Sequence, residues 1–103
     1  MVDYIKYDGK DYPIKIAFAA LNNFEKEAGI PLTAMGEELK NHEILCWHAL
    51  VAGHKMEKKE MTLVREDVEM VLSESLKQFM DIFMSSMVQM QTDLSGVEPN
   101  KKK

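Results

Sequence analysis

The residues best suited to metal chemistry in this chain are three histidines and a single cysteine. His42 and Cys46 are four positions apart, so on a helix they share one face, and zinc accepts both kinds of ligand. A third ligand is missing nearby, because His48 points to another side of the helix and His54 lies about two turns beyond Cys46. Neither a CxxC nor an HExxH pattern is present. The sequence therefore disfavours a metal site, no cofactor is expected, and His48 is interpreted as a helix histidine whose polar end lies at the margin of the core.

Cys46 is also a poor candidate nucleophile. A reactive cysteine needs solvent access and a lowered pKa, whereas Cys46 lies within residues 44–52, where His48 is the only polar side chain. Residues 55–66, KMEKKEMTLVRE, lack the central glycine and the alternating oxygen ligands of a calcium-binding EF-hand loop. Adjacent acidic residues elsewhere are better explained as solvated helix faces, and no glycine-rich phosphate-binding loop is present. We therefore expect a protein that is not an enzyme.

Length and charge exclude further classes of protein. The 103 residues suit one domain, and a net charge of −4 does not supply the positive field on which nucleic-acid binding depends. A lone cysteine cannot form an internal disulfide, which is typical of a reducing compartment. Asp3 and Lys6 interrupt any apolar run at the start of the chain, and the apolar run of residues 44–52 is shorter than the about 20 residues that cross a bilayer. We expect a cytoplasmic protein that binds neither nucleic acid nor membrane.

The most apolar stretch, residues 43–54 with the sequence EILCWHALVAGH, predicts the helix around which the other elements are arranged. Its apolar side chains point in almost every direction around the helix axis, which is typical of a helix surrounded by neighbours. Asn41 is the expected N-cap, and Glu43 lies in the expected first turn, where the helix macrodipole favours an anion.

Residues 4–16 predict a β-hairpin. Asp8 and Gly9 are a preferred pair for a two-residue type I′ turn, because both positions need a positive φ. This turn places Lys6 opposite Asp11 and gathers the apolar side chains on one face, which would lie on the helices: Ile5, Tyr7, Tyr12, Ile14 and Ile16. Pro13 has no N–H group and marks its strand as an edge.

Two helices are expected between the hairpin and the central helix. The first is Phe18–Ala28, because Gly29 suits the left-handed position after a helix and Pro31 prevents its continuation. The second is a short helix over residues 34–39, with Thr33 as its N-cap.

Two more helices are expected after the central one, over residues 63–72 with Thr62 as N-cap and over residues 76–92. Ser73 or Ser75 would separate them, although the chain could equally run through as one long helix. The predicted fold class is therefore mainly α, a small α+β domain: the hairpin packs on a compact bundle of about four to five helices within residues 1–94. Residues 95–103 are expected to form a flexible tail.

The last helix is rich in methionine; the chain has nine methionines and only four phenylalanines. Methionine fills irregular cores and is also frequent on surfaces that bind variable apolar partners. An apolar stripe suited to packing on the central helix is formed by Leu76, Phe79, Met80, Phe83, Met87 and Met90. Ile82, Met84 and Val88 fall outside this stripe. They either complete the core or a contact between copies of the chain, or belong to a surface that grips an apolar segment of another protein. The candidate partner-binding residues are Met80, Ile82, Met84, Met87, Val88 and Met90.

Residues 4–90 contain three parts in a characteristic order: the opening DGKDYPIKIAFAALNNFEKEAGIPL, the central apolar helix, and MTLVREDVEMVL followed by a final amphipathic helix. In this order of parts the sequence resembles the small tail assembly chaperones of long-tailed bacteriophages and prophages. It implies a mostly helical cytoplasmic protein that self-associates and covers the apolar helices of the tape measure protein until tail tube subunits polymerise around it. The resemblance carries no reaction centre, so it transfers no site residues.

Two alternatives to this function stay open at this point. One is a structural or connector subunit that remains in the phage particle. The other is a small regulatory domain with a helix-turn-helix, which the acidic charge disfavours.

Overall fold

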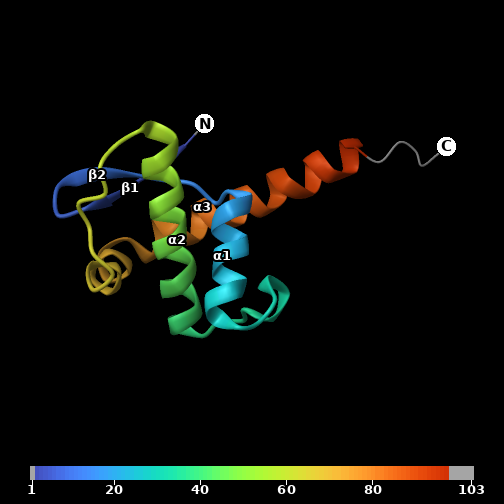
Figure 1. The fold of residues 1–103 in the computed structure, drawn as a ribbon, viewed down its shortest axis with the longest axis horizontal. Helices are drawn as coiled ribbons and strands as arrows, with labels where there is room; N and C mark the ends of the chain where they lie inside the picture. Colours follow the sequence, from blue (N-terminus) through green and yellow to red (C-terminus); the bar gives the residue numbers. More distant parts are fainter. Residues whose placement is uncertain (1, 98–103) are drawn as a thin grey trace.

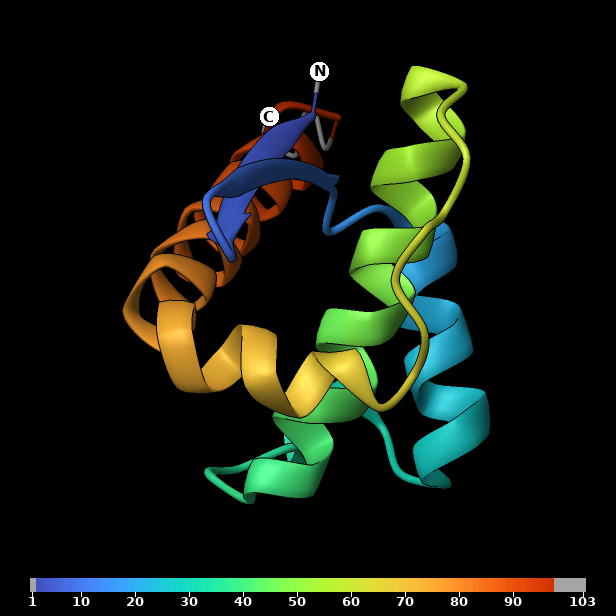
Figure 2. The same cartoon turned by 90° about the vertical axis from the view of Figure 1, so that its left-hand side faces the viewer.

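The chain folds as a β-hairpin held between two long helices, with a third helix on the outer side of one of them (Figures 1 and 2). The computed structural model describes residues 2–97, with side chains up to residue 90. In chain order, the elements are β1 (Asp3–Tyr7), β2 (Lys10–Ile14), α1 (Phe18–Ala28), a 3₁₀ turn (Leu32–Ala34), α2 (Leu39–Glu57) and α3 (Asp67–Val97). α1 packs on α2, β2 packs on α2, and β1 packs on α3. The predicted class, mainly α with a small sheet, is confirmed, but the described residues form fewer helices than the four to five expected.

The hairpin has the predicted register, with Lys6 opposite Asp11 and Tyr7 opposite Lys10. Asp8 and Gly9 have φ values of 52° and 76°, as the type I′ turn requires. The predicted apolar face is directed inward: three of its members are buried and the two tyrosines are half-buried, namely Ile5, Ile14, Ile16, Tyr7 and Tyr12.

The prediction of a short helix over residues 34–39 is wrong. The segment forms only a single 3₁₀ turn, Leu32–Ala34, after which Gly36 takes a left-handed conformation with φ of 62°. A residue in that conformation does not continue a right-handed helix. Asn41 is not the N-cap of the central helix either, because α2 begins two residues earlier, at Leu39. The Asn41 side chain is buried and donates a hydrogen bond to the Met35 carbonyl (2.9 Å), so it fixes the incoming loop instead.

The last two predicted helices form one element with a bend. α3 begins at Asp67, where the Asp67 carboxylate accepts a hydrogen bond from the backbone N–H of Val64 (2.8 Å), so Thr62 is not the cap. Ser75 has non-helical dihedral angles (φ −130°, ψ 34°), and α3 bends there, at one of the two predicted break points. The helical backbone continues to Val97, past the predicted boundary at residue 94. The rest of the expected tail, residues 98–103, lies outside the described residues.

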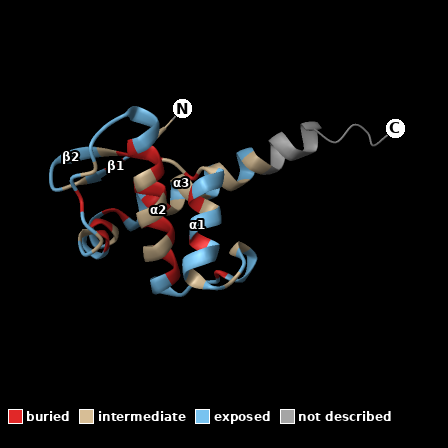
Figure 3. Cartoon of the chain, in the orientation of Figure 1, coloured by how far each residue is buried: buried red, intermediate tan, exposed pale blue. Residues whose placement is uncertain are grey.

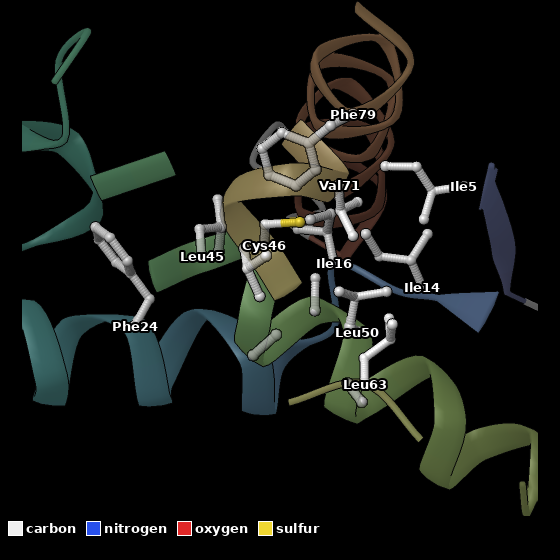
Figure 4. Close-up of a cluster of buried hydrophobic side chains, with 14 of the residues drawn as sticks. Ile5, Ile14, Ile16, Phe24, Leu45, Cys46, Leu50, Leu63, Val71 and Phe79 are labelled. Atoms are coloured by element: carbon white, nitrogen blue, oxygen red, sulfur yellow. The ribbon is translucent and has the colours of Figure 1, made fainter. Parts of the chain in front are cut away.

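The core gathers side chains from the hairpin, α2 and α3. Figure 4 shows Ile5 and Ile14 of the hairpin close to Val71 and Phe79 of α3, with Cys46 of α2 beneath them. All five side chains are fully buried. Two buried side chains of α1, Ala20 and Phe24, extend the core across the other side of α2. The bend of α3 therefore lets both of its halves contribute to one core.

Gly53 of α2 allows β2 to approach the helix very closely. A Cβ atom at position 53 would lie 2.5 Å from the Ile14 N and Cα atoms and 2.6 Å from the Pro13 carbonyl carbon. Such distances are far below van der Waals contact, and the obstructing atoms belong to the main chain, which cannot rotate away.

Replacing Gly53 with alanine should therefore lower the free energy of unfolding by about 2 kcal/mol, because the strain of overpacking exceeds the gain in helix propensity of about 1 kcal/mol. Urea denaturation followed by circular dichroism measures this loss. Ala19→Gly, at an exposed position of α1, is the control and should cost about 1 kcal/mol for its propensity alone. An unchanged or raised stability of Gly53→Ala would contradict the close packing of β2 on α2.

Candidate functional site

The candidate partner-binding residues lie on the half of α3 that extends past α1 (Figure 1). Met84 and Val88 are exposed, with 56% and 60% of their surface accessible. The other four are half-buried at the edge of the core: Met80, Ile82, Met87 and Met90. In Figure 3 the coloured part of this half of α3, up to residue 90, carries mostly intermediate and exposed residues. The six residues therefore divide into two that face solvent and four that are partly covered.

Hydrogen bonds to the free edge of β1 fix the rotation of α3 about its axis. The Gln78 side chain accepts a hydrogen bond from the Lys6 N–H (2.9 Å). It also donates a hydrogen bond to the main-chain carbonyl of another β1 residue, Tyr4 (3.3 Å). The Ser75 hydroxyl donates to the Lys6 carbonyl, and the Glu74 carboxylate accepts from the Asp8 N–H (3.2 Å). These main-chain groups point away from β2, so the polar side chains of α3 take the place of a third strand.

This rotation decides which apolar side chains are left outside. Phe79 follows Gln78 and is fully buried beneath the hairpin. Val88 lies nine residues after Phe79, about 180° around the helix, and so faces solvent. The prediction that the whole apolar stripe packs on the central helix is wrong in part. α3 packs more extensively on β1 than on α2. Leu76, a member of the stripe, stays 42% exposed.

The result is a continuous row of exposed and half-buried apolar side chains along α3, which we call the outer face of α3. Its members recur at spacings of three or four residues and are therefore neighbours on the helix surface. They are Leu76, Met80, Met84, Met87 and Val88.

A hollow of about 400 Å³ lies beside the bend of α3 and continues this face toward the start of α2. Its apolar lining is formed by Leu39, Leu72 and Leu76, of which Leu39 is 75% exposed. Sequence reasoning missed this hollow, because Leu39 was assigned to the end of the wrongly predicted short helix. The available signal was a large apolar residue directly before the polar start of the central helix.

A second hollow, of about 480 Å³, separates α3 from the start of α1. Phe18 and Met90 line it together with polar side chains and main chain, and Phe18 is 81% exposed. Met90 therefore faces α1 and not the outer face of α3.

His48, one of the histidines considered above as a metal ligand, takes part in a polar contact that joins α1, α2 and the loop before α3. The Glu27 carboxylate of α1 accepts a hydrogen bond from His48 Nε2 of α2 (2.8 Å) and pairs with Arg65 of the loop before α3. The Arg65 guanidinium also lies 5.9 Å from the ring centroid of Trp47. His48 thus has its polar end at the core margin, as predicted. The hydrogen bond from Arg65, aided by that from His48, lowers the pKa of Glu27 below its ordinary value.

The lowered pKa of Glu27 predicts an acid-dependent contribution to stability. A carboxyl group with a lowered pKa in the folded state stabilises the protein above the pKa of the unfolded chain, and this contribution is lost as the pH falls through the folded-state pKa. Glu27→Gln should therefore lower the free energy of unfolding by about 0.5–1 kcal/mol at neutral pH, a range suited to a half-exposed, screened pair. The difference from wild type should shrink below about pH 4 in urea titrations. Glu66→Gln, at an exposed position, is the control; an equal effect of both changes would refute a specific role of Glu27.

The remaining candidates are buried, and the two histidines among them bond to main chain. Burial raises the pKa of the Cys46 thiol to about 12, which opposes formation of the reactive thiolate. His42 Nδ1 donates to the Glu38 carbonyl (2.9 Å) and His54 Nδ1 donates to the Leu50 carbonyl (2.7 Å), each one helical turn earlier. These two Nδ1 atoms are therefore engaged by main-chain carbonyls of α2 and of the residue that precedes it.

Among the described residues, no three His, Cys, Asp or Glu side chains come together as a possible metal site. No helix in this part of the chain has the length and apolar character needed to cross a membrane. The most distinctive apolar features of the described surface are therefore the outer face of α3 and the two hollows described above, which lie beside α3. Comparison of the chain with family models, curated proteins and solved structures finds no match.

Proposed function

We propose that this protein is a non-enzymatic tail assembly chaperone of a long-tailed phage or prophage, which covers apolar helical segments of the tape measure protein in the host cytoplasm. The resemblance of residues 4–90 to that family supplies the partner. The observation that carries the proposal is the outer face of α3, where Met84 and Val88 remain 56% and 60% exposed although the core is complete without them.

The outer face of α3 supplies enough apolar surface for weak binding. Full burial of a Met or Val side chain stabilises by about 1.5–3 kcal/mol, so covering the exposed half of each contributes about 1 kcal/mol. The five residues of the outer face together supply a few kcal/mol, from which the entropy cost of association must be subtracted. A single copy would thus bind weakly, and several copies along one tape measure protein would hold it through avidity.

Weak contacts suit a chaperone that is later displaced. Tail tube subunits must replace it on the tape measure protein, which tight binding at each position would prevent. Three of the five residues on the outer face are methionines, Met80, Met84 and Met87, whose flexible side chains adapt to different apolar partners. The net charge of −4 would help to keep the coated complex in solution.

The test is co-expression with the tape measure protein of the same phage or prophage genome. The chaperone should co-purify with the tape measure protein, keep it soluble, and be absent from purified virions by mass spectrometry. Presence in virions at the stoichiometry of a tail component would replace the proposal with a structural subunit. Failure to bind or solubilise the tape measure protein would refute it.

A further inference from the structure

The hollow beside the bend of α3 is continuous with the outer face of α3. Leu76 lines the hollow and lies one helical turn before Met80, so a ligand on the outer face would reach the hollow without crossing polar surface. Leu39 and Leu72 complete its apolar lining. Its volume of about 400 Å³ lies in the range of pockets that hold small ligands, so one large side chain fits. Large apolar side chains seated in such hollows are frequent anchors of protein interfaces.

The surroundings of the hollow are acidic. Glu43 and Glu69 line it, and Glu37 and Glu38 directly precede Leu39. Among the described residues none of these four carboxylates forms an ion pair. Of the described residues that line it, Lys40 is the only lysine or arginine, and His42 lines it as well. The carboxylates outweigh Lys40 and the half positive charge at the N-terminus of α2, so this end of the site attracts positive charge.

The outer face of α3 suits a helix more than a strand. The free edge of β1 is occupied by α3 side chains, so a strand finds no main chain to pair with there. Leu76 and Val88 are about 18 Å apart at 1.5 Å per residue, which matches about three turns of a partner helix. An amphipathic helix laid along such a face presents an apolar side chain every third or fourth residue.

We propose that the segment bound by this protein is an amphipathic helix whose apolar stripe is flanked by lysine or arginine, with one large apolar side chain seated in the hollow. This inference rests on the proposed function and specifies the chemistry of its partner. The apolar stripe provides affinity on the outer face of α3, and the basic flank near the anchor meets Glu43 and Glu69. Basic flanks are thereby selected over acidic ones.

Three synthetic peptides of about 18 residues, five helical turns, test this preference by calorimetric titration of the full-length protein. One carries a leucine and phenylalanine stripe flanked by lysine, one carries the same stripe flanked by glutamate, and one has the composition of the first with the stripe dispersed. The lysine peptide should bind about tenfold more tightly than the glutamate peptide at low ionic strength, and the ratio should shrink at about 0.5 M salt. The dispersed peptide should bind at least about tenfold more weakly than the lysine peptide.

Variants of the protein locate the preference. Glu43→Gln with Glu69→Gln should reduce the lysine-to-glutamate ratio to about threefold or less. Lys77→Gln with Asp81→Asn, which removes an exposed pair of zero net charge, is the control and should leave the ratio unchanged. Leu39→Ser, at a 75% exposed position, should weaken binding of both striped peptides by about threefold to tenfold.

The outcomes separate this inference from the proposed function. Equal binding of the two striped peptides overturns the charge preference and leaves the proposed function standing. Equal binding of the lysine peptide and its dispersed form shows non-specific attraction and also overturns the inference, as does unchanged affinity after Leu39→Ser. Failure of both striped peptides to bind at low ionic strength contradicts the inference, and the proposed function is contradicted only if the co-expressed tape measure protein also stays unbound.

Discussion

The double variant Met84→Asp with Val88→Asp should fold like the wild type and bind the tape measure protein at least about 100-fold more weakly. Both side chains are exposed in the free protein, so their replacement removes little of the core. In a complex, the lost burial of the two side chains costs about 2 kcal/mol. Desolvation of two carboxylates against an apolar partner adds at least about 1 kcal/mol, and the total corresponds to a factor of about 100.

Pull-down of the co-expressed tape measure protein measures the binding, and thermal melting followed by circular dichroism measures the fold. Asn22→Asp with Asn23→Asp, on the exposed side of α1, adds the same charge away from the outer face of α3 and is the matched control. The control should bind like the wild type. Binding by the folded Met84/Val88 variant within a factor of three of wild type would exclude the outer face of α3 as the site.

Phe79→Ala should lower the free energy of unfolding by about 3–5 kcal/mol, the typical cost of truncating a buried phenylalanine. Phe79 is 0% exposed and stacks on Phe83, with ring centroids 6.5 Å apart. It lies between the hairpin and α2, so the loss of its ring opens a cavity where three elements meet (Figure 4). Because small domains have total stabilities of about 5–15 kcal/mol, such a loss leaves many molecules partly open at physiological temperature.

Urea denaturation gives the change in unfolding free energy, and hydrogen exchange shows where the protein opens. Protection should fall in α3 and the hairpin more than in α1, which packs on the opposite side of α2. Met84→Ala, on the exposed side of the same helix, is the control and should change stability by less than about 0.5 kcal/mol. A cost below about 1 kcal/mol for Phe79→Ala would contradict its central place in the core.

Local sequence signals correctly predicted the hairpin turn, the end of α1 and the bend of α3. Asp8 and Gly9 fixed the turn and hence the register of the hairpin, because the two-residue loop leaves one pairing. Gly29, with φ of 75°, and Pro31 marked the end of α1, which has the predicted bounds. Ser75 was one of two predicted break points and is where α3 bends. These signals act within a few residues, so a single sequence reveals them.

Features that depend on distant residues were not predictable. Asparagine is a common N-cap residue, but the Asn41 side chain instead donates a hydrogen bond to the Met35 carbonyl of the preceding loop. The folded structure is needed to show that this carbonyl lies within reach. From the sequence, Gly53 is only a residue of low helix propensity. The structure shows that the β2 backbone occupies the space a side chain would need. The helical wheel placed Met84 and Val88 outside the apolar stripe but left open whether they are buried or exposed. The hollow at Leu39 arises from the bend of α3 and the early start of α2.

The hydrogen bonds between α3 side chains and the β1 backbone also affect how a partner could bind this protein. Since Glu74, Ser75 and Gln78 already bond to two amides and two carbonyls along this edge of the hairpin, an approaching chain meets side chains of α3 before it reaches the β1 backbone. Contacts made by flexible thioethers have no fixed hydrogen-bond repeat, so side chains of different shape can pack on the outer face of α3 with little change in energy. Under the proposed function, such a surface would accept many partner sequences and would allow an incoming subunit to replace it stepwise.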